Sequence, residues 1–487
     1  MPIPLLDLFS TGEATIFAAG AVLLAAVAIL GDVLRTSGVP AVHSRRVVHM
    51  LVGLTVAGAP FVLPTPRVLV ALAVVFVAAN AVMWARGWLP GMHEARPSSL
   101  GTVLFPLSVL PAIGLTWLVD PGRIPAFQGA FLVLAVADPA AGWLGDERKD
   151  KSVEGSLAFG LVALAASIVC LLTVGPDASL GAVITGAVVI AAATTAAEAV
   201  GRNGWDNLFV VLAAVGAAVP WLESPASPLV MFAVLAGIVF AGLAYAVHAL
   251  SWDGALAGGL LAASFVAWVP LEWAGPAVVF FVGSSALSVI GRERKASQTE
   301  RVQKAGPRDA AQVLANGGVA WILLGLTLAT SDPLIGFGIL GAFAAAAADT
   351  WATELGTLST GRPVSLRTWT RVAPGTSGAV SGIGTLASAG GAASVAVTAL
   401  LLGLTDVGGM LLIVVAGIAG AWTDSLAGAY LQGMYRNPVT GVATERRPRH
   451  AREPERGYAF IDNETVNAIA TATGACLAIL LAGLVMS

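Results

Sequence analysis

The chain has 487 residues, of which 57% are hydrophobic and only 11% are charged. A soluble fold cannot hide so much apolar surface, so the composition excludes a soluble protein and predicts a polytopic membrane protein. The formal net charge of −3 adds little, because the distribution of charge along a membrane protein matters more than its sum. Cys170 and Cys476 fall within apolar runs, so we expect free thiols.

Apolar runs that could cross a bilayer, roughly 20 residues each, follow one another along the chain. In the first half they lie at 14–34, 47–64, 67–85, 99–118, 125–144, 156–174, 178–199 and 206–222. In the second half they lie at 228–249, 254–271, 273–290, 311–329, 333–351, 377–403, 407–431 and 464–485. The sequence therefore predicts an all-α polytopic membrane protein of about 16 transmembrane helices. They form two halves of about eight with the same orientation, since eight spans return the chain to its starting side.

The cations suggest an orientation for these helices. With the N-terminus outside, every lysine and arginine except Arg67 and Arg123 falls in a predicted inner loop. The positive-inside rule favours this arrangement, which turns the polar loops described below toward the cytoplasm. No cleavable signal peptide is evident at the N-terminus, and a bacterial inner membrane is our expectation.

A Pro/Ser-rich segment, LESPASPL at 222–229, separates two predicted domains, 1–222 and 223–487. Each half has an acid at a helix end, a basic loop, a helix start rich in small residues, a second acid and an Asp-Asn pair. The first half supplies Asp138, Lys151, Glu154-Gly155-Ser156, Glu198 and Asp206-Asn207. The second half supplies Asp349, Arg371, Gly375-Thr376-Ser377-Gly378, Asp424 and Asp462-Asn463. The repeated order suggests an ancient duplication, or a fusion of two related proteins.

This combination of residues is typical of a phosphate and metal site. Carboxylates at membrane helix ends are costly and therefore read as functional, and they can hold Mg²⁺. Cations and free N–H groups at a helix start attract phosphate. Simpler readings exist for other features. Arg45, Arg46 and His49 are equally well explained as topology-setting charges and a helix-end histidine, 292–308 reads as a solvated basic loop, and part of 376–391 reads as close helix packing.

Two family resemblances rest on these residues. The first half resembles the phytol kinase and dolichol kinase family, related to phosphatidate cytidylyltransferases, through RRVVH (45–49), ADPAA (137–141), KSVEGS (151–156) and the later E…DN. The second half resembles the phytyl-phosphate kinase family through QVLANGG (312–318), ADTWATELG (348–356), RVAPGTSGAVS (371–381), GTLAS (384–388), AWTDSLAG (421–428) and DNETVN (462–467).

The resemblances imply a membrane kinase pair that uses Mg²⁺ and CTP or another nucleoside triphosphate. The first half would phosphorylate phytol or a related isoprenoid alcohol, and the second would convert the monophosphate to the diphosphate. We expect a lipid bilayer around the protein and no nucleic-acid partner. A cytidylyltransferase activity in one half, or a secondary transporter or flippase, remains an alternative.

The residue roles follow as hypotheses. Metal ligands would be Asp138, Glu198, Asp349, Glu354, Asp424 and Asp462, and Glu154 would be a helix cap or a further ligand. Asp206 would be another ligand or the base that receives the alcohol proton. The phosphates would contact Lys151, Gly155, Ser156, Asn207, Arg371, Gly375, Thr376, Ser377, Gly378, Ser381 and Asn463.

Overall fold

The structure is a computed structural model that describes residues 10–86, 99–145, 151–174, 178–224, 228–290, 306–358, 361–437, 441, 443–445 and 453–486. Contacts within the chain divide it into two units, Met1–Val234 and Leu235–Ser487, which we call unit 1 and unit 2. The division falls within helix α10 (Pro228–Ala246). Each unit is described by itself.

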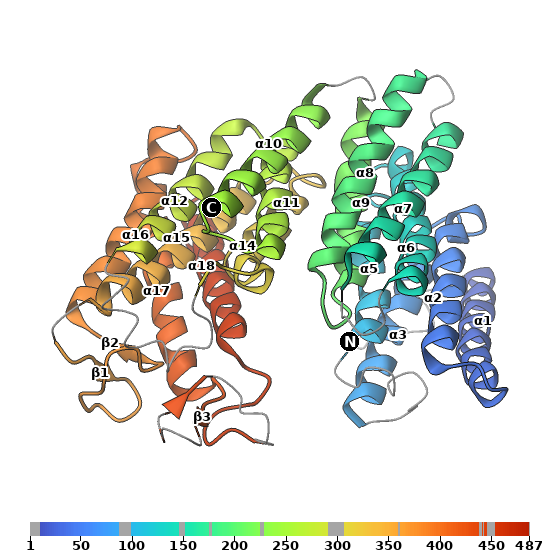
Figure 1. Cartoon of the computed structure of the whole chain (residues 1–487). Coiled ribbons are helices and arrows are strands. Elements are labelled where there is room, and N and C mark those ends of the chain that lie inside the picture. The colour runs from blue at the N-terminus through green and yellow to red at the C-terminus, as the bar shows by residue number, and fades with distance from the viewer. Residues whose placement is uncertain are drawn as a thin grey trace. The chain divides into compact units, whose positions relative to one another are not determined.

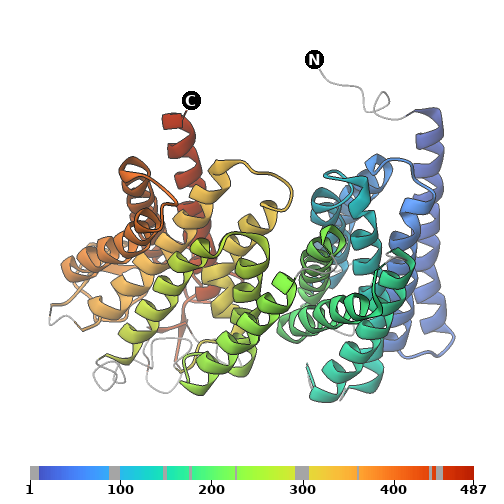
Figure 2. The ribbon, with the colours of Figure 1, turned by 90° about the horizontal axis from the view of Figure 1, so that it is seen from above.

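Unit 1 is a bundle of long helices, and each apolar run expected before residue 223 overlaps one of them (Figure 1). They are α1 (Thr11–Thr36), α2 (Ala41–Gly58), α3 (Arg67–Arg86), α5 (Gly101–Leu115), α6 (Ile124–Leu144), α7 (Val153–Val174), α8 (Leu180–Val200) and α9 (Asp206–Glu223). Short 3₁₀ turns cover Ala59–Phe61 and Pro121–Arg123. Helix α1, dark blue in Figure 2, lies at the outer edge of the bundle and packs on α2 and α3.

Helix α6 forms the core of unit 1. It packs against α2, α7 and α9, and its Phe127, Phe131 and Leu134 side chains are fully buried. The Phe127 and Phe131 rings are in contact at a centroid distance of 4.9 Å, with their planes tilted by 50°. This packing fixes the end of α6 that carries Asp138.

Unit 2 contains the remaining helices and two small antiparallel ribbons. The helices are α11 (Trp252–Trp268), α12 (Ala274–Val289), α14 (Ala310–Leu326), α15 (Pro333–Gly356), α16 (Gly382–Leu401), α17 (Val407–Tyr430) and α18 (Asn463–Met486), with a 3₁₀ turn at Leu271–Trp273. Strand β1 (Val364–Ser365) pairs with β2 (Ala379–Val380), and β3 (Tyr435–Arg436) pairs with β4 (Ala443–Thr444). Figure 1 shows β1, β2 and β3 at one end of the unit 2 helices.

Helix α15 is the core of unit 2, and small residues bring its neighbours close. Every residue from Ala342 to Ala348 is 2% exposed or less. All of them are alanines apart from Phe343, which contributes the one large side chain of this stretch. A Cβ added at Gly341 would lie 2.4 Å from the carbonyl oxygen of Gly474 on α18, and one at Gly391 on α16 would lie 2.5 Å from that of Ala347. Backbone therefore packs directly on backbone, as in other membrane helix pairs.

Helix α16 begins later than the sequence predicts, at Gly382 instead of residue 377. Of the intervening residues, Ala379 and Val380 pair with β1, and the Ser381 hydroxyl accepts a hydrogen bond from the Gly384 N–H at 3.1 Å as the helix N-cap. The small residues from 375 to 380 are thus a loop and a strand, so their backbone groups are not committed to a helix.

The structure confirms an all-α polytopic membrane protein, apart from the two ribbons. Within the described residues, eleven helices are long and apolar enough to cross a membrane, and three more apolar helices are shorter. Each predicted span overlaps a helix, but the number of spans that cross the bilayer stays a prediction. Both cysteines are free thiols, as expected.

Candidate functional site

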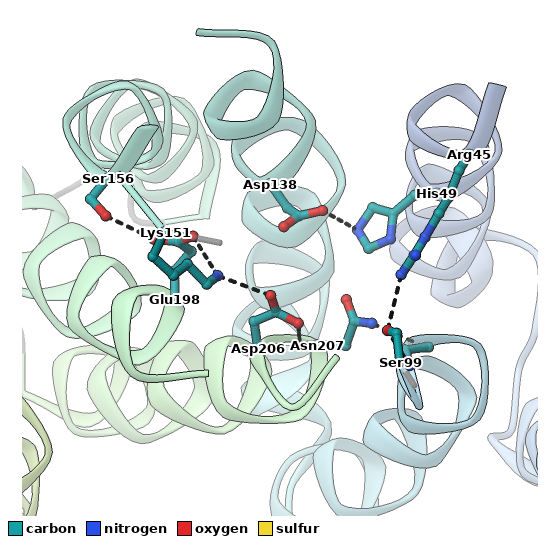
Figure 3. A network of polar contacts seen from close by, with 10 residues as sticks. Arg45, His49, Ser99, Asp138, Lys151, Ser156, Glu198, Asp206 and Asn207 are labelled. Carbon is teal, nitrogen blue, oxygen red and sulfur yellow. Dashed lines mark hydrogen bonds and ion pairs between the residues drawn. The ribbon is translucent and has the colours of Figure 1, made fainter. Parts of the chain in front are cut away.

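In unit 1, polar side chains from several helix ends meet in one network, which Figure 3 shows from close by. Lys151, just before α7, lies with its Nζ 2.6 Å from Glu198 Oε1 at the end of α8 and 3.0 Å from Asp206 Oδ2 at the start of α9. The Ser156 hydroxyl of α7 donates to Glu198 Oε2 at 3.1 Å. Residues far apart in sequence are therefore brought to one place, as the sequence predicts for these four.

The ion pairs of Lys151 are shielded from solvent. Its side chain is 13% exposed, and those of Glu198 and Asp206 are 6% and 19% exposed. Burial alone would lower the pKa of Lys151, but the carboxylates of Asp206 and Glu198 outweigh it and raise the pKa above its ordinary value. The ammonium therefore stays charged and neutralises two carboxylates.

Asp138 joins the network from α6 and faces α2. Its Oδ2 lies 3.6 Å from Nε2 of His49, beyond hydrogen-bonding range, and this buried nitrogen has no hydrogen-bond partner among the described residues. The His49 ring packs edge-on against Phe105 at a centroid distance of 5.1 Å. Asp138 is 30% exposed, which leaves its carboxylate accessible beside the buried Lys151 cluster.

Asn207 holds the α8–α9 turn against α5. Its amide donates to the carbonyl of Gly101 at 3.0 Å, and its N–H donates to Asp206 Oδ1 at 3.0 Å. Gly204 has a φ of +93°, and a Cβ there would lie 2.2 Å from the Gly101 nitrogen. Asn207 thus positions Asp206, a role the structure adds to the predicted contact with phosphate.

Two predicted residues of unit 1 point elsewhere. Glu154 is exposed on the first turn of α7. The Gly155 N–H already donates to the Ser152 hydroxyl at 3.1 Å, as in a helix cap. Neither joins the network of Figure 3.

Unit 2 contains a cavity of about 990 Å³ where α12, α15, α16 and α17 end or begin. Its wall includes all three predicted carboxylates from α15 and α17 and most of the predicted phosphate contacts. These are Asp349, Glu354, Asp424, Gly375, Thr376, Ser377, Gly378, Ser381 and Asn463. The volume suits a nucleotide-sized or similar ligand.

The carboxyl groups of Asp349 on α15 and Asp424 on α17 line the same cavity and lie close enough to interact with each other. With its amide oriented to suit its neighbours, Asn467 of α18 donates to Asp424 Oδ2 at 3.0 Å. Three helices thus converge on one acid pair. Two carboxylates so close together repel when both are ionised, so the pair is suited to share a cation.

The loop before β2 presents backbone donors to the same cavity. Gly375 and Gly378 adopt left-handed φ values of +77° and +73°, and a Cβ at Gly378 would lie 2.4 Å from the Ala429 backbone. Within the part of the chain the structure describes, the N–H groups of Gly375, Ser377 and Gly378 donate to no protein group. Open N–H groups in such a turn form an anion-binding concavity.

Gln432, which the sequence analysis did not single out, lies beside this loop. Its Oε1 accepts a hydrogen bond from the Ser377 hydroxyl, which also contacts the Gly428 carbonyl at 3.2 Å. Gln432 is 2% exposed and lines the cavity, yet its Nε2 has no partner among the described residues. A buried unpaired donor at a cavity wall indicates a ligand acceptor.

The cations of unit 2 are arranged differently from the prediction. Arg371 is exposed and is absent from the cavity wall, whereas Arg308 lines it. Arg308 Nη2 donates to the Ser288 hydroxyl at 3.4 Å, and Ser288 in turn donates to Glu354 Oε1. Burial lowers the pKa of the Arg308 guanidinium, and Glu354 acts in the opposite direction.

Arg308 belongs to the basic segment read as a solvated loop, of which 291–305 lies outside the described residues. Asp309 and Gln312 form a capping box, a pattern that marks the start of a helix. This pattern in the sequence could have indicated that Arg308 lies directly at the start of α14. Asp462 caps α18 through the Thr465 N–H at 2.9 Å and is absent from the cavity wall.

No group of three or more His, Cys, Asp or Glu residues gathers at metal-ligand spacing in the described parts of the chain. Mg²⁺ commonly uses one or two carboxylates together with substrate phosphates and water, and Asp349 with Asp424 fits that donor set. In unit 1 the Lys151 ammonium occupies the space between Glu198 and Asp206, so a metal held by both acids would have to displace it.

Comparison with known proteins places the chain among membrane proteins. The model of the integral membrane protein family DUF92 matches residues 235–475. Protein PGR of Arabidopsis thaliana is 30% identical over 268 residues, which cover 49% of this chain and 90% of that protein. No solved structure matches the chain.

Two uncharacterized membrane proteins are also similar. The one from Methanocaldococcus jannaschii is 30% identical over 203 residues, 42% of this chain and 73% of its own length. The one from Synechocystis is 29% identical over 221 residues, 44% of this chain and 76% of its own length. The family match and the coverage of these relatives show that the chain belongs to the DUF92 family of integral membrane proteins.

Proposed function

We propose that this protein is a bifunctional, Mg²⁺-dependent kinase of isoprenoid alcohols that uses CTP or another nucleoside triphosphate. Unit 1 would convert the alcohol to its monophosphate, and unit 2 would convert the monophosphate to the diphosphate. The observation that carries the proposal is the unit 2 cavity, which combines an acid pair with a loop of open N–H groups.

The chemistry asked of unit 2 is mainly positioning and neutralisation of charge. The N–H groups of Gly375, Ser377 and Gly378 would bind the nucleotide phosphates, and Asp349 with Asp424 would hold Mg²⁺ beside them. When bound, Mg²⁺ would neutralise charge on the transferred phosphoryl group. The acceptor phosphate is already anionic, so the site needs no strong base.

Unit 1 has an alcohol to activate and therefore needs a proton acceptor. Asp206 and Glu198 are both bound to Lys151, whereas Asp138 is more exposed and accepts no hydrogen bond from the described residues. Asp138 is accordingly the better candidate for the base. Lys151 is the candidate for neutralising the nucleotide phosphates, after a metal ion has replaced it at the carboxylates of Glu198 and Asp206. The Ser156 hydroxyl holds Glu198 in place.

The test is an assay on purified protein in lipid vesicles with phytol, Mg²⁺ and CTP labelled at the γ-phosphate. We expect labelled monophosphate and diphosphate together with CDP. Asp138→Asn should abolish phosphorylation of the alcohol and spare that of added monophosphate, and Asp424→Asn should do the reverse. Glu272→Gln removes an exposed carboxylate outside both sites and serves as the control.

Several results would contradict the proposal. Loss of both activities in either folded variant would refute two separate sites. A CDP-lipid product with release of pyrophosphate would identify a cytidylyltransferase. Solute uptake by the vesicles, without any labelled lipid, would favour a transporter.

A further inference from the structure

The unit 2 cavity has a second group of polar residues in its wall, Arg308, Ser288 and Glu354, which are hydrogen-bonded to one another in series. On α15, Glu354 follows Asp349 by five residues, about 7–8 Å along the helix axis. On α17, Gly428 follows Asp424 by about one turn and contacts Ser377 of the loop. Both polar groups therefore lie toward the C-terminal ends of α15 and α17 from the acid pair, and all of them line one cavity.

Arg308 is held firmly at this wall by its backbone. Its N–H donates to the Ala249 carbonyl at 3.1 Å, and its carbonyl accepts from the Ser251 N–H at 3.0 Å. A Cβ at Gly254 would lie 2.2 Å from the same carbonyl oxygen, so only glycine allows this approach. The backbone of Arg308 is thus fixed just before the start of α14.

The guanidinium has donors to spare. Of its five N–H groups, one makes the long contact to Ser288, and the described residues offer it no other hydrogen bond. Arg308 has no nitrogen among the buried unpaired atoms, and it lines the cavity, so its remaining donors face cavity space. A partly buried guanidinium with free donors is suited to bind a phosphate through two parallel hydrogen bonds.

The neighbouring face of α12 changes from polar to apolar. Ser288, Ser285 and Phe281 are spaced by three and four residues, so they lie on one side of the helix, and all three line the cavity. Val282 and Val247, also on the cavity wall, are 57% and 71% exposed at the outside of unit 2. The cavity therefore leads from a cationic end to an apolar surface of the kind that meets lipid.

We propose that Arg308 and the α12 face from Ser288 to Phe281 form the acceptor subsite, which takes a long-chain alkyl monophosphate lying in the membrane. Arg308 binds the monophosphate, and the chain runs past Phe281 and Val282 into lipid. The glycine loop then takes the nucleotide, and the acid pair lines the cavity that donor and acceptor share. This inference rests on the function proposed for unit 2.

The test measures binding before activity. Purified full-length protein in detergent is titrated with phytyl monophosphate, with phytol and with CTP, without turnover. Arg308→Gln should weaken binding of phytyl monophosphate by roughly 10- to 100-fold, as expected for loss of a charged hydrogen bond, and should leave CTP binding within about 2-fold. Arg362→Gln removes an exposed arginine of the same unit from outside the cavity, so it is the matched control.

A second variant tests the chain path. Val282→Trp should weaken binding of phytyl monophosphate but not of inorganic phosphate. If Arg308→Gln does not fold, Arg308→Lys keeps the charge without the fork and should lose affinity by a smaller factor. Unchanged affinity for phytyl monophosphate in the folded Arg308 variants would overturn the inference, as would equal weakening of CTP binding. If the wild-type protein binds the monophosphate but does not phosphorylate it with any nucleotide tested, the proposed kinase activity is refuted and the binding subsite is retained.

Discussion

Replacing Lys151 with methionine should strongly destabilise unit 1. The ammonium contacts Glu198 at 2.6 Å and Asp206 at 3.0 Å, and these carboxylates are 6% and 19% exposed. Removing one member of such a buried ion pair costs about 3–5 kcal/mol, because the remaining charge keeps its desolvation penalty. We expect a loss of that size in the free energy of unfolding.

The assay is unfolding by SDS in mixed micelles, followed by tryptophan fluorescence. Arg436→Gln breaks the exposed pair with Glu455, whose members are 61% and 50% exposed, and should cost less than about 1 kcal/mol. The double variant Lys151→Met/Glu198→Gln should be more stable than Lys151→Met alone, since one uncompensated charge is gone. A Lys151→Met protein within about 1 kcal/mol of wild type would refute the reasoning.

The same ion pairs and the glycine loop give two further predictions. Because the folded state raises the pKa of Lys151, its contribution is complete below the ordinary lysine value of about 10.4 and is lost as pH rises through the higher folded value. Unfolding titrations between pH 8 and about 12 should show this alkaline loss in wild type and not in Lys151→Met; identical profiles would contradict it. Gly378→Ala should weaken CTP binding at least roughly 10-fold and cost about 1–3 kcal/mol of stability, since φ is +73° and the Cβ would lie 2.4 Å from Ala429. Gly382→Ala has open space around it and should match wild type in both measurements.

The helices were predictable because a membrane span needs a long apolar run and every run is visible in the sequence. The start of α16 was not, since residues 377–381 are as small and apolar as the helix that follows. Only pairing with Val364 and Ser365, more than ten residues earlier, shows that Ala379 and Val380 within this stretch form a strand. Pairing of that kind depends on tertiary contacts, which composition does not reveal.

In the candidate sites, the acidic residues could be predicted from the sequence, but the basic residues could not. Carboxylates in apolar surroundings are conspicuous, so Asp138, Glu198, Asp349 and Asp424 could be selected from their cost alone. The cations could not, because arginines are common in inner loops and their side chains are long. Arg371 is exposed and Arg308 lines the cavity because the backbone of residue 308 pairs with the α10–α11 connection. The positions of His49 beside Asp138 and of Gln432 beside Ser377 likewise depend on contacts between helices that are far apart in the sequence.

The backbone packing around α15 has a consequence for how the acceptor range of unit 2 can change. Where glycine and alanine place one helix directly on another, no side chain can rearrange to absorb a larger residue, so substitutions near Gly341 or Gly474 should give unfolded protein. The rim formed by Phe281 and Val282 has no such restriction. Under the function proposed for unit 2, libraries that seek new isoprenoid chain lengths therefore belong on α12, where substitutions leave the acid pair in place.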